Sequence, residues 1–284
     1  MDLHQLAHRI GDVGGLDRVA TPLAAAVKQR IPRGPVKDLL SGTGLGHPLH
    51  PVLTDLPIGF FTSAAVLDVV GGRRAAPAVD GLLALGIAST LPTASAGLSD
   101  WSDTQGSEQR VGLVHALANV TALSFFAASL LARRRGHRAR GRALTLFGMT
   151  TLATGGYLGG YLSYARGVGV NHAFFEPDLE EWTAVIGEGD VHAGSPTMVE
   201  SDGATILLYR AAGGILAIGS RCSHAGGPLH EGKIDDGALC VECPWHASVF
   251  RLGDGSVVHG PASVPQPAYD VRVLDGRVEV RRRS

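Results

Sequence analysis

The sequence predicts two unlike parts, an α-helical transmembrane bundle of four helices followed by an all-β antiparallel domain. Three long stretches contain no charged residue: 81–99, 111–132 and 143–165. Residues 1–171 hold 16 Lys/Arg and 10 Asp/Glu, whereas residues 172–284 hold 9 and 16, so the net charge of −1 hides two opposite halves. Such a distribution excludes a plain cytosolic enzyme, a disordered chain and a nucleic-acid binder built on a basic surface.

The uncharged stretches have the length of membrane spans. A helix needs roughly 20 mostly apolar residues to cross the hydrocarbon core of a bilayer. We therefore predict helices at about 55–72, 77–98, 111–132 and 143–165, the first with a single charge at Asp68. Composition divides the chain into an irregular, amphipathic segment, the transmembrane domain, a linker and the β domain: 1–46, 47–166, 167–181 and 182–284.

The β domain is predicted from short runs that alternate with turn signals. The runs rich in β-branched and aromatic residues are 205–209, 215–218, 269–274 and 277–280. Asp-Gly pairs, which favour tight hairpin turns, stand at 236–237, 254–255 and 275–276. This pattern indicates a compact antiparallel β domain outside the bilayer.

Two Cys/His pairs in the β domain carry its chemistry. Cys222-Ser-His224 and Cys243-Pro-Trp-His246 are separated by 18 residues. Thiolates and imidazoles together suit either tetrahedral zinc or a two-iron cluster. Structural zinc sites usually pair like ligands, whereas each pair here holds one cysteine and one histidine. The spacing therefore favours a cluster in which one iron takes both cysteines and the other takes both histidines.

The C-x-H…C-x-x-H segment closely resembles the Rieske [2Fe–2S] family, over about residues 182–283. The resemblance implies a Rieske-type antiparallel β-sandwich. It also implies that Cys222 and Cys243 bind a buried iron, and that His224 and His246 bind an outer iron facing solvent or a redox partner.

Departures from the family pattern point to the ferredoxin type. Quinol-oxidising members carry a disulfide between the two loops, but those positions here are Gly227 and Trp245. Ser248 matches a position whose hydroxyl can bond a cluster sulfide, while Phe250 replaces a tyrosine of high-potential members. Fewer hydrogen bonds to the sulfurs lower the potential, so a low to intermediate value is expected. Ala247 stands where glycine is more common.

The third cysteine, Cys240, forms a C-x-x-C with Cys243. A thioredoxin-like motif is one interpretation, but we expect a buried strand residue because the resemblance gives Cys243 to iron.

The run His47-Pro48-Leu49-His50-Pro51 resembles a bacterial membrane family of unknown function, number 2231, over about residues 44–165. Four alternating helices would bring this run to the same membrane face as the start of the third helix, which holds His115 and Asn119. A pocket lined by His47, His50, His115 and Asn119 could hold haem or quinone. Alternatively, these residues only hydrogen-bond the helix ends together.

These features predict a membrane-anchored electron-transfer protein rather than a stand-alone enzyme. Its [2Fe–2S] cluster would pass single electrons between a membrane carrier, such as quinone or haem, and an unidentified protein partner. An iron–sulfur subunit of a larger oxidoreductase and a non-catalytic redox sensor are alternatives. We expect the bacterial cytoplasmic membrane, and the positive-inside rule favours an extracytoplasmic β domain because arginines cluster at 73–74 and 133–142. No nucleic-acid partner is expected.

Overall fold

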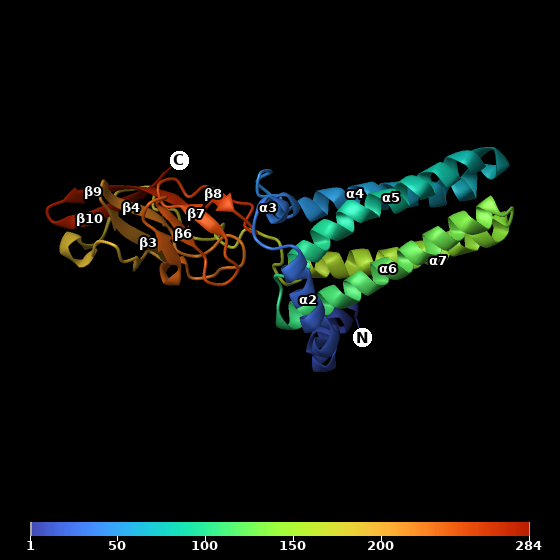
Figure 1. Ribbon diagram of the computed structural model, residues 1–284, viewed down its shortest axis with the longest axis horizontal. Coiled ribbons are helices and arrows are strands. Elements are labelled where there is room, and N and C mark those ends of the chain that lie inside the picture. The colour runs from blue at the N-terminus through green and yellow to red at the C-terminus, as the bar shows by residue number, and fades with distance from the viewer. Residues whose placement is uncertain (1, 284) are drawn as a thin grey trace. The chain divides into compact units, whose positions relative to one another are not determined.

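The computed structural model describes residues 2–283 and divides into two compact units (Figure 1). One unit, the helical unit, comprises Met1–Ile31 and Leu49–Val168. The other, the β unit, comprises Pro32–Pro48 and Gly169–Ser284. A short segment from the N-terminal third of the chain therefore belongs to the β unit, although composition alone groups it with the residues before it.

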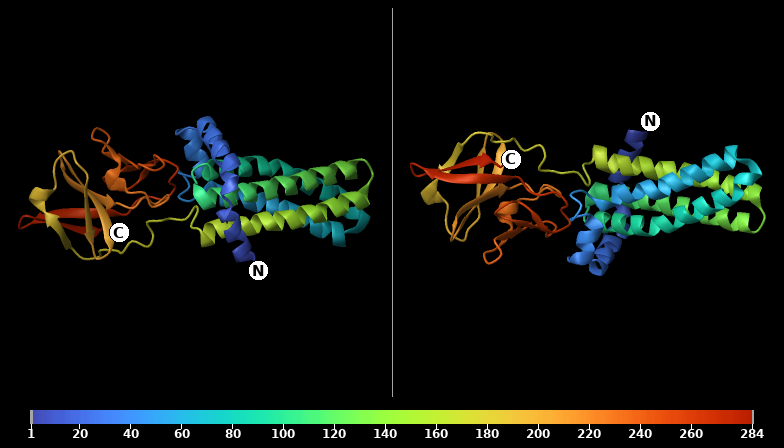
Figure 2. Two further views of the ribbon diagram at one scale, coloured as in Figure 1. Left: turned by 90° about the horizontal axis from the view of Figure 1, so that it is seen from below. Right: turned by 90° about the horizontal axis from the view of Figure 1, so that it is seen from above.

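The helical unit is built on four long helices, which confirms the helices predicted for this region. They are α4 (Leu49–Val70), α5 (Ala76–Trp101), α6 (Gly106–Arg134) and α7 (Arg138–Gly160), the last continued by a π-helical turn, Tyr161–Ala165. α4 packs along α5 and α6 along α7, and the two hairpins face each other (Figure 2).

Among the described residues, three helices rather than four are long and apolar enough to cross a membrane: α4, α5 with the turn before it, and α6. α7 has the predicted position but falls short because glycine and threonine lower its hydropathy. Three shorter helices, α1 (Leu3–Asp12), α2 (Asp17–Arg30) and α3 (Pro35–Ser41), bring the described residues to seven α-helices rather than the four expected for the bundle.

The first long helix begins earlier than the predicted residue 55 and includes part of the His-Pro run. α4 begins at Leu49, so His50 and Pro51 lie in its first turn. Proline is tolerated there because the first N–H groups of a helix have no partner within the helix. His50 is thereby fixed to a helix.

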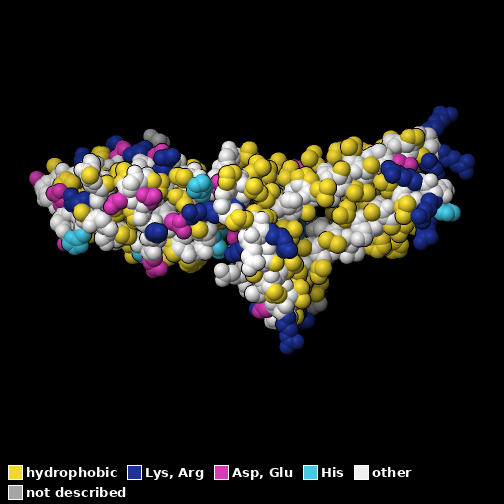
Figure 3. Space-filling view, in the orientation of Figure 1, with side chains coloured by type: hydrophobic (Ala, Val, Ile, Leu, Met, Phe, Trp, Pro, Cys, Tyr) yellow, Lys and Arg dark blue, Asp and Glu magenta, His cyan; other side chains and the backbone are white. Residues whose placement is uncertain are grey.

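Side chains of α4 and α6 meet across the core of the helical unit. The rings of Phe61 and Phe126 stack with centroids 3.8 Å apart. Nearer the arginine-rich end, which Figure 3 shows in dark blue, Arg133 forms an ion pair with Asp68, and its Nη1 lies 3.1 Å from Asp68 Oδ1. Arg133 is buried, so it serves the packing of the bundle rather than the exposed positive surface.

The β unit contains two antiparallel sheets. One has six strands in the order β1-β10-β9-β4-β3-β2, and the other has four in the order β5-β6-β7-β8. The strands of the first sheet are β1 (Thr183–Gly187), β2 (Thr197–Ser201), β3 (Ala204–Ala211), β4 (Gly214–Gly219), β9 (Ala268–Leu274) and β10 (Arg277–Arg282). Those of the second are β5 (Lys233–Asp235), β6 (Cys240–Glu242), β7 (Val249–Arg251) and β8 (Val257–His259).

Strand β3 explains how both faces of the larger sheet are buried. Leu207 and Tyr209 belong to a core that also contains Cys222 and Cys243. Ile206 and Leu208, which alternate with these two residues along the strand, pack into a second core on the opposite face. Because side chains alternate along a strand, one strand serves both cores.

Turn chemistry sets two of the two-residue hairpins. Asp275 and Gly276, with φ of 49° and 74°, join β9 to β10 as the sequence predicts. Asp202 and Gly203, with φ of 49° and 83°, join β2 to β3 in the same way. This second Asp-Gly turn was missed in the sequence, although its signal is identical.

Removing the negative partner of the buried Arg133 should destabilise the bundle. Asp68→Asn leaves the guanidinium charge without compensation, and breaking a buried ion pair typically costs about 3–5 kcal/mol. Thermal unfolding of the full chain in detergent measures the effect. Asp55→Asn is the matched control, since Asp55 is exposed on the same helix; equal stability losses in the two variants would contradict the importance of the pair.

Candidate metal centre

The two Cys/His pairs lie on two loops that are closed by the same hydrogen bonds. In the first loop the Cys222 N–H donates to the Gly227 carbonyl at 2.8 Å, and the Cys222 carbonyl accepts from the Gly226 N–H at 2.7 Å. In the second loop the equivalent bonds join Cys243 to Ser248 at 2.8 Å and to Ala247 at 3.0 Å. Each cysteine is thus held at the start of the same tight turn.

The residue four positions after each cysteine has a left-handed backbone. Gly226 has φ of 77° and Ala247 has φ of 60°. Glycine reaches this region at no steric cost, whereas an L-residue pays roughly 1–2 kcal/mol. The sequence pattern singles out Ala247 as a departure, and the structure shows the turn forming around it regardless.

The two cysteine thiols are buried and share a hydrogen bond. That bond from Cys222 is the main reason why the pKa of the Cys243 thiol falls to about 6, and the backbone N–H groups of Trp245 and His246 lower it further. The site therefore stabilises a thiolate, the form of cysteine that binds metal.

The two histidine rings lie beside each other. The centroids of His224 and His246 are 4.9 Å apart, with ring planes at 82°. Both side chains are half-buried, whereas the cysteines are buried. The four groups thus separate into an inner pair of sulfurs and an outer pair of imidazoles.

This arrangement fits a two-iron cluster with two protein ligands on each iron. Among residues 2–283, no three or more His, Cys, Asp or Glu side chains converge where one metal ion could be held. Cys240 lies in β6, buried, with its Sγ 3.3 Å from the Ala238 carbonyl, as expected for a strand residue.

Close approach of the loops depends on Gly227. A Cβ at this position would lie 2.9 Å from Cys243 Sγ and 3.1 Å from the Trp245 ring. Gly227 and Trp245 stand at the two positions where quinol-oxidising members carry the cysteines of an inter-loop disulfide. All three cysteines of this chain are free thiols.

Two buried serines tie the loops to the segment that follows β8. Ser223 Oγ donates to the Val264 carbonyl at 2.7 Å. Ser248 Oγ accepts from the Ala262 N–H at 2.9 Å, which leaves its own proton for another acceptor. Phe250 is fully buried in the core that surrounds the cysteines.

The segment around α3 braces this downstream stretch, a role that sequence reasoning missed. Asp38 accepts from the Gly260 N–H at 2.8 Å and pairs with His259 at 3.0 Å. Thr43 Oγ1 donates to the Ala262 carbonyl at 3.1 Å. Asp38 and His259 are 221 residues apart in the chain, so no local pattern signals their contact.

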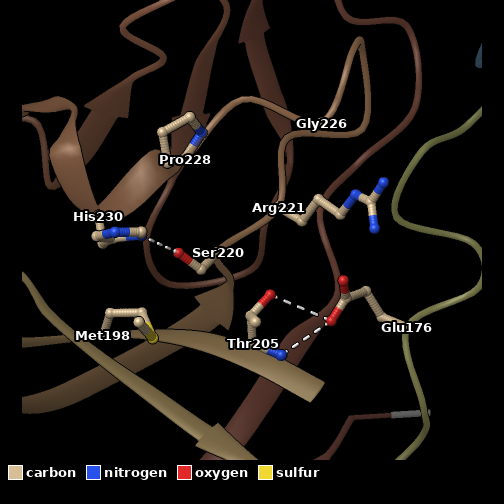
Figure 4. Close-up of a pocket in the computed structure, with 8 residues that line it drawn as sticks. All are labelled: Glu176, Met198, Thr205, Ser220, Arg221, Gly226, Pro228 and His230. Atoms are coloured by element: carbon tan, nitrogen blue, oxygen red, sulfur yellow. Dashed lines mark hydrogen bonds between the residues drawn. The ribbon is translucent and has the colours of Figure 1, made fainter. Parts of the chain in front are cut away.

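A pocket of about 230 Å³ lies behind the first loop (Figure 4). His230 Nδ1 and Ser220 Oγ are 2.8 Å apart at one side, and Glu176 accepts from Thr205 N at 2.8 Å at the other. His230 is therefore bound to the frame of the first loop and stands apart from the four metal-binding candidates.

The expected membrane-domain histidines divide between the units. His50, His115 and Asn119 come together in the helical unit, where the ring centroids of the two histidines are 6.4 Å apart. His47 belongs to the β unit, is exposed, and lies 3.1 Å from the Pro48 carbonyl through Nδ1.

Comparison with known proteins assigns a family to each part. Residues 181–270 match the Rieske [2Fe-2S] domain, and residues 46–172 match a predicted membrane protein family, DUF2231. The chain is 30% identical to the anthranilate 1,2-dioxygenase ferredoxin subunit of Burkholderia cepacia, over 37% of this chain and 95% of that protein. It is 36% identical to the 3-phenylpropionate/cinnamic acid dioxygenase ferredoxin subunit of Escherichia coli K12, over 31% of this chain and 82% of that protein.

Among solved structures, the ferredoxin of carbazole 1,9a-dioxygenase from Nocardioides aromaticivorans IC177 is similar. Its identity is 29%, its TM-score is 0.35, and the match covers 37% of this chain and 100% of that one.

Replacing Ala247 by glycine should stabilise the second loop. The substitution removes the cost of the left-handed backbone, but glycine also gives the unfolded chain more conformational freedom. We expect the free energy of unfolding to rise by a net amount of about 0.5–1 kcal/mol. Unfolding of the full chain, followed by loss of the cluster's visible absorbance, measures it. Ala238→Gly, at a position of a neighbouring turn where φ is not positive, should instead reduce stability; a loss in both variants would show that Ala247 is unstrained.

Proposed function

Because the chain belongs to the Rieske [2Fe–2S] family, we propose that it is a membrane-anchored, ferredoxin-type electron carrier. It passes single electrons between a redox carrier in the membrane and a protein partner. The observation that carries this proposal is the two-plus-two convergence of buried thiols and half-buried imidazoles, in a chain that also holds three helices apolar enough to span a bilayer. The bound cluster supplies one-electron exchange.

In this proposal each ligand pair has a distinct task. Cys222 and Cys243 hold the inner iron, and the backbone N–H groups that approach their sulfurs stabilise the thiolates. His224 and His246 hold the outer iron and form the exit for the electron, because these histidines are less buried than the cysteines. Neutral imidazole ligands also leave the oxidised centre less negative than four thiolates would, which raises its potential.

Ser248 and Phe250 adjust the potential. The free proton of Ser248 is available to a cluster sulfur, since its oxygen accepts from Ala262. Phe250 offers no hydroxyl to the site and only packs against the core. One such hydrogen bond rather than two is consistent with a low to intermediate potential.

The same proposal gives the protein an orientation. The turn between α4 and α5 holds Arg73 and Arg74, and further arginines lie in the turn between α6 and α7 and in the helix ends beside it. The chain leaves α7 for the β unit at the opposite helix end. The positive-inside rule then makes the arginine-rich turns cytoplasmic and the β unit extracytoplasmic.

Electron paramagnetic resonance of the reduced full-length protein in detergent tests the function. We expect a Rieske-type signal and about two irons per chain. His224→Ala should abolish the signal, whereas His230→Ala should retain it because the ring of His230 contacts Ser220 and Glu231. A purified protein that holds iron without this signal, or equal behaviour of the two variants, would refute the ligand assignment.

Ser248→Ala should lower the midpoint potential by roughly 20–60 mV. One hydrogen bond contributes a net free energy of about 0.5–1.5 kcal/mol, and this range of potential is the same free energy expressed for a one-electron couple. Potentiometric titration gives the value. Ser223→Ala is the matched control, because that buried hydroxyl already donates to Val264; a shift of the same size there would mean that general loop disturbance, rather than a sulfur hydrogen bond, sets the potential.

A further inference from the structure

The helical unit contains an internal repeat. Residues of α4 and α6 that are 65 positions apart meet across the core: His50 with His115, Phe61 with Phe126, and Asp68 with Arg133. α4 and α6 run in the same direction, so the same three layers follow one another from one end of the unit to the other. The first hairpin, α4–α5, and the second, α6–α7, are therefore equivalent halves.

The partner helices repeat in the same way, 62 positions apart. A Cβ on Gly86 would lie 2.5 Å from the Phe61 ring, and one on Gly148 would lie 2.8 Å from the Phe126 ring. A Cβ on Gly97 would lie 2.7 Å from the His50 ring, and one on Gly159 would lie 3.0 Å from the His115 ring. Each aromatic ring thus fits a hollow over a glycine of its own hairpin, and the two histidines are symmetry-related.

Both histidines are fixed from behind by a backbone carbonyl. His50 Nδ1 lies 3.0 Å from the Thr93 oxygen, and His115 Nδ1 lies 2.8 Å from the Gly155 oxygen. A carbonyl only accepts, so Nδ1 carries the proton in each ring and Nε2 of the neutral imidazole carries a lone pair. This is the tautomer and the orienting bond of metal-binding histidines.

Asn119 does not occupy the lone pair of His115. Its Nδ2 donates to the His115 carbonyl at 2.9 Å and lies 3.2 and 3.5 Å from the two ring nitrogens. Such similar distances put the amide over the face of the ring, whereas a bond to Nε2 would lie in the ring plane.

The separation of the rings suits one metal ion between them. With metal–nitrogen bonds of about 2.0–2.1 Å on both sides, two imidazoles on opposite sides of an ion have centroids roughly 6–6.5 Å apart. The observed distance is 6.4 Å. No third His, Cys, Asp or Glu side chain joins the pair among residues 2–283, so the remaining ligands of the ion would have to come with it.

We propose that His50 and His115 are the two axial ligands of one b-type haem, held on the pseudo-twofold axis of the helical unit. A tetrapyrrole supplies the four equatorial nitrogens that the protein lacks, and facing helices of a bundle are a common place for such cofactors. The haem is not covalently attached, because all three cysteines lie in the β unit. Figure 3 shows an opening between the two hairpins.

This inference deepens the proposed function, since the haem would be the membrane redox carrier. One electron would pass between the two centres, with ferrous haem iron becoming ferric as the cluster is reduced, or the reverse, and no other reactant is required. The haem ligands and the cluster ligands belong to different units, so each assignment can fail independently.

Optical and binding measurements on the full chain test the haem site. Protein produced with haem precursor and purified in detergent should contain about one haem b, with the reduced spectrum of a six-coordinate, low-spin iron. Haemin added to haem-depleted protein should bind at one site. Wild-type protein that neither contains haem nor binds haemin would overturn the proposal.

Variants separate ligation from a merely structural role. His50→Gln keeps a donor toward the Thr93 carbonyl but removes the ring nitrogen, and His115→Gln does the same toward Gly155. Each should weaken haemin binding more than roughly tenfold and remove the low-spin spectrum. His47→Gln, outside the pair, should change neither. Low-spin spectra that survive both ligand substitutions would also overturn the proposal.

The cluster signal is the internal control in every sample. Its retention in the His50 and His115 variants shows that the β unit is folded, and an unchanged helical circular-dichroism signal shows the same of the helical unit, so lost haem binding then reports ligation. A missing cluster signal in a protein that binds haem would instead refute the proposed function and leave the haem site intact.

Discussion

The paired hydrogen bonds that close each cysteine loop are the interaction on which the redox site depends. Each cysteine donates to the carbonyl five positions later and accepts from the N–H four positions later, so both sulfurs leave identical turns. Because the turns are alike, the two loops can face each other and divide their ligands into an inner sulfur pair and an outer imidazole pair. Gly227 permits that approach, and Ala247 accepts a left-handed backbone for it.

The loops are in turn held by residues distant in the chain. Ser223 and Ser248 bind the stretch after β8, and Asp38 and Thr43 bind the same stretch from the segment around α3. That segment is continuous with α4 at Leu49, so the chain contributes to the β unit before it enters the four long helices. Residues that precede the four long helices in the chain and residues that follow them therefore both contribute to the frame of the cluster site.

What the sequence predicts well is local. The turn at Asp275 and the positions of the four long helices depend on neighbouring residues, and both are found as predicted. The ligand assignment from the Cys/His spacing is equally local and stays a prediction. The bracing by Asp38 could not be predicted, because its partner is 221 residues away. Composition also misjudged Arg133, since only the packing of α4 against α6 shows that this arginine pairs with Asp68 inside the bundle.

The two histidine pairs also show that sequence patterns reveal local groupings but not contacts between distant residues. His224 and His246 are visible in the sequence because each accompanies a cysteine within one short loop. His50 and His115 lie on different helices, and their equivalence emerges only when Thr93 and Gly155 are seen to hold the two rings alike. In both sites backbone groups fix ligand side chains, with N–H groups directed at the cysteine sulfurs in the β unit and carbonyls directed at the imidazoles in the helical unit. In each half of the repeat a histidine, the carbonyl that holds it and the glycine facing its ring recur together, so the two rings meet in equivalent settings at the centre of the helical unit.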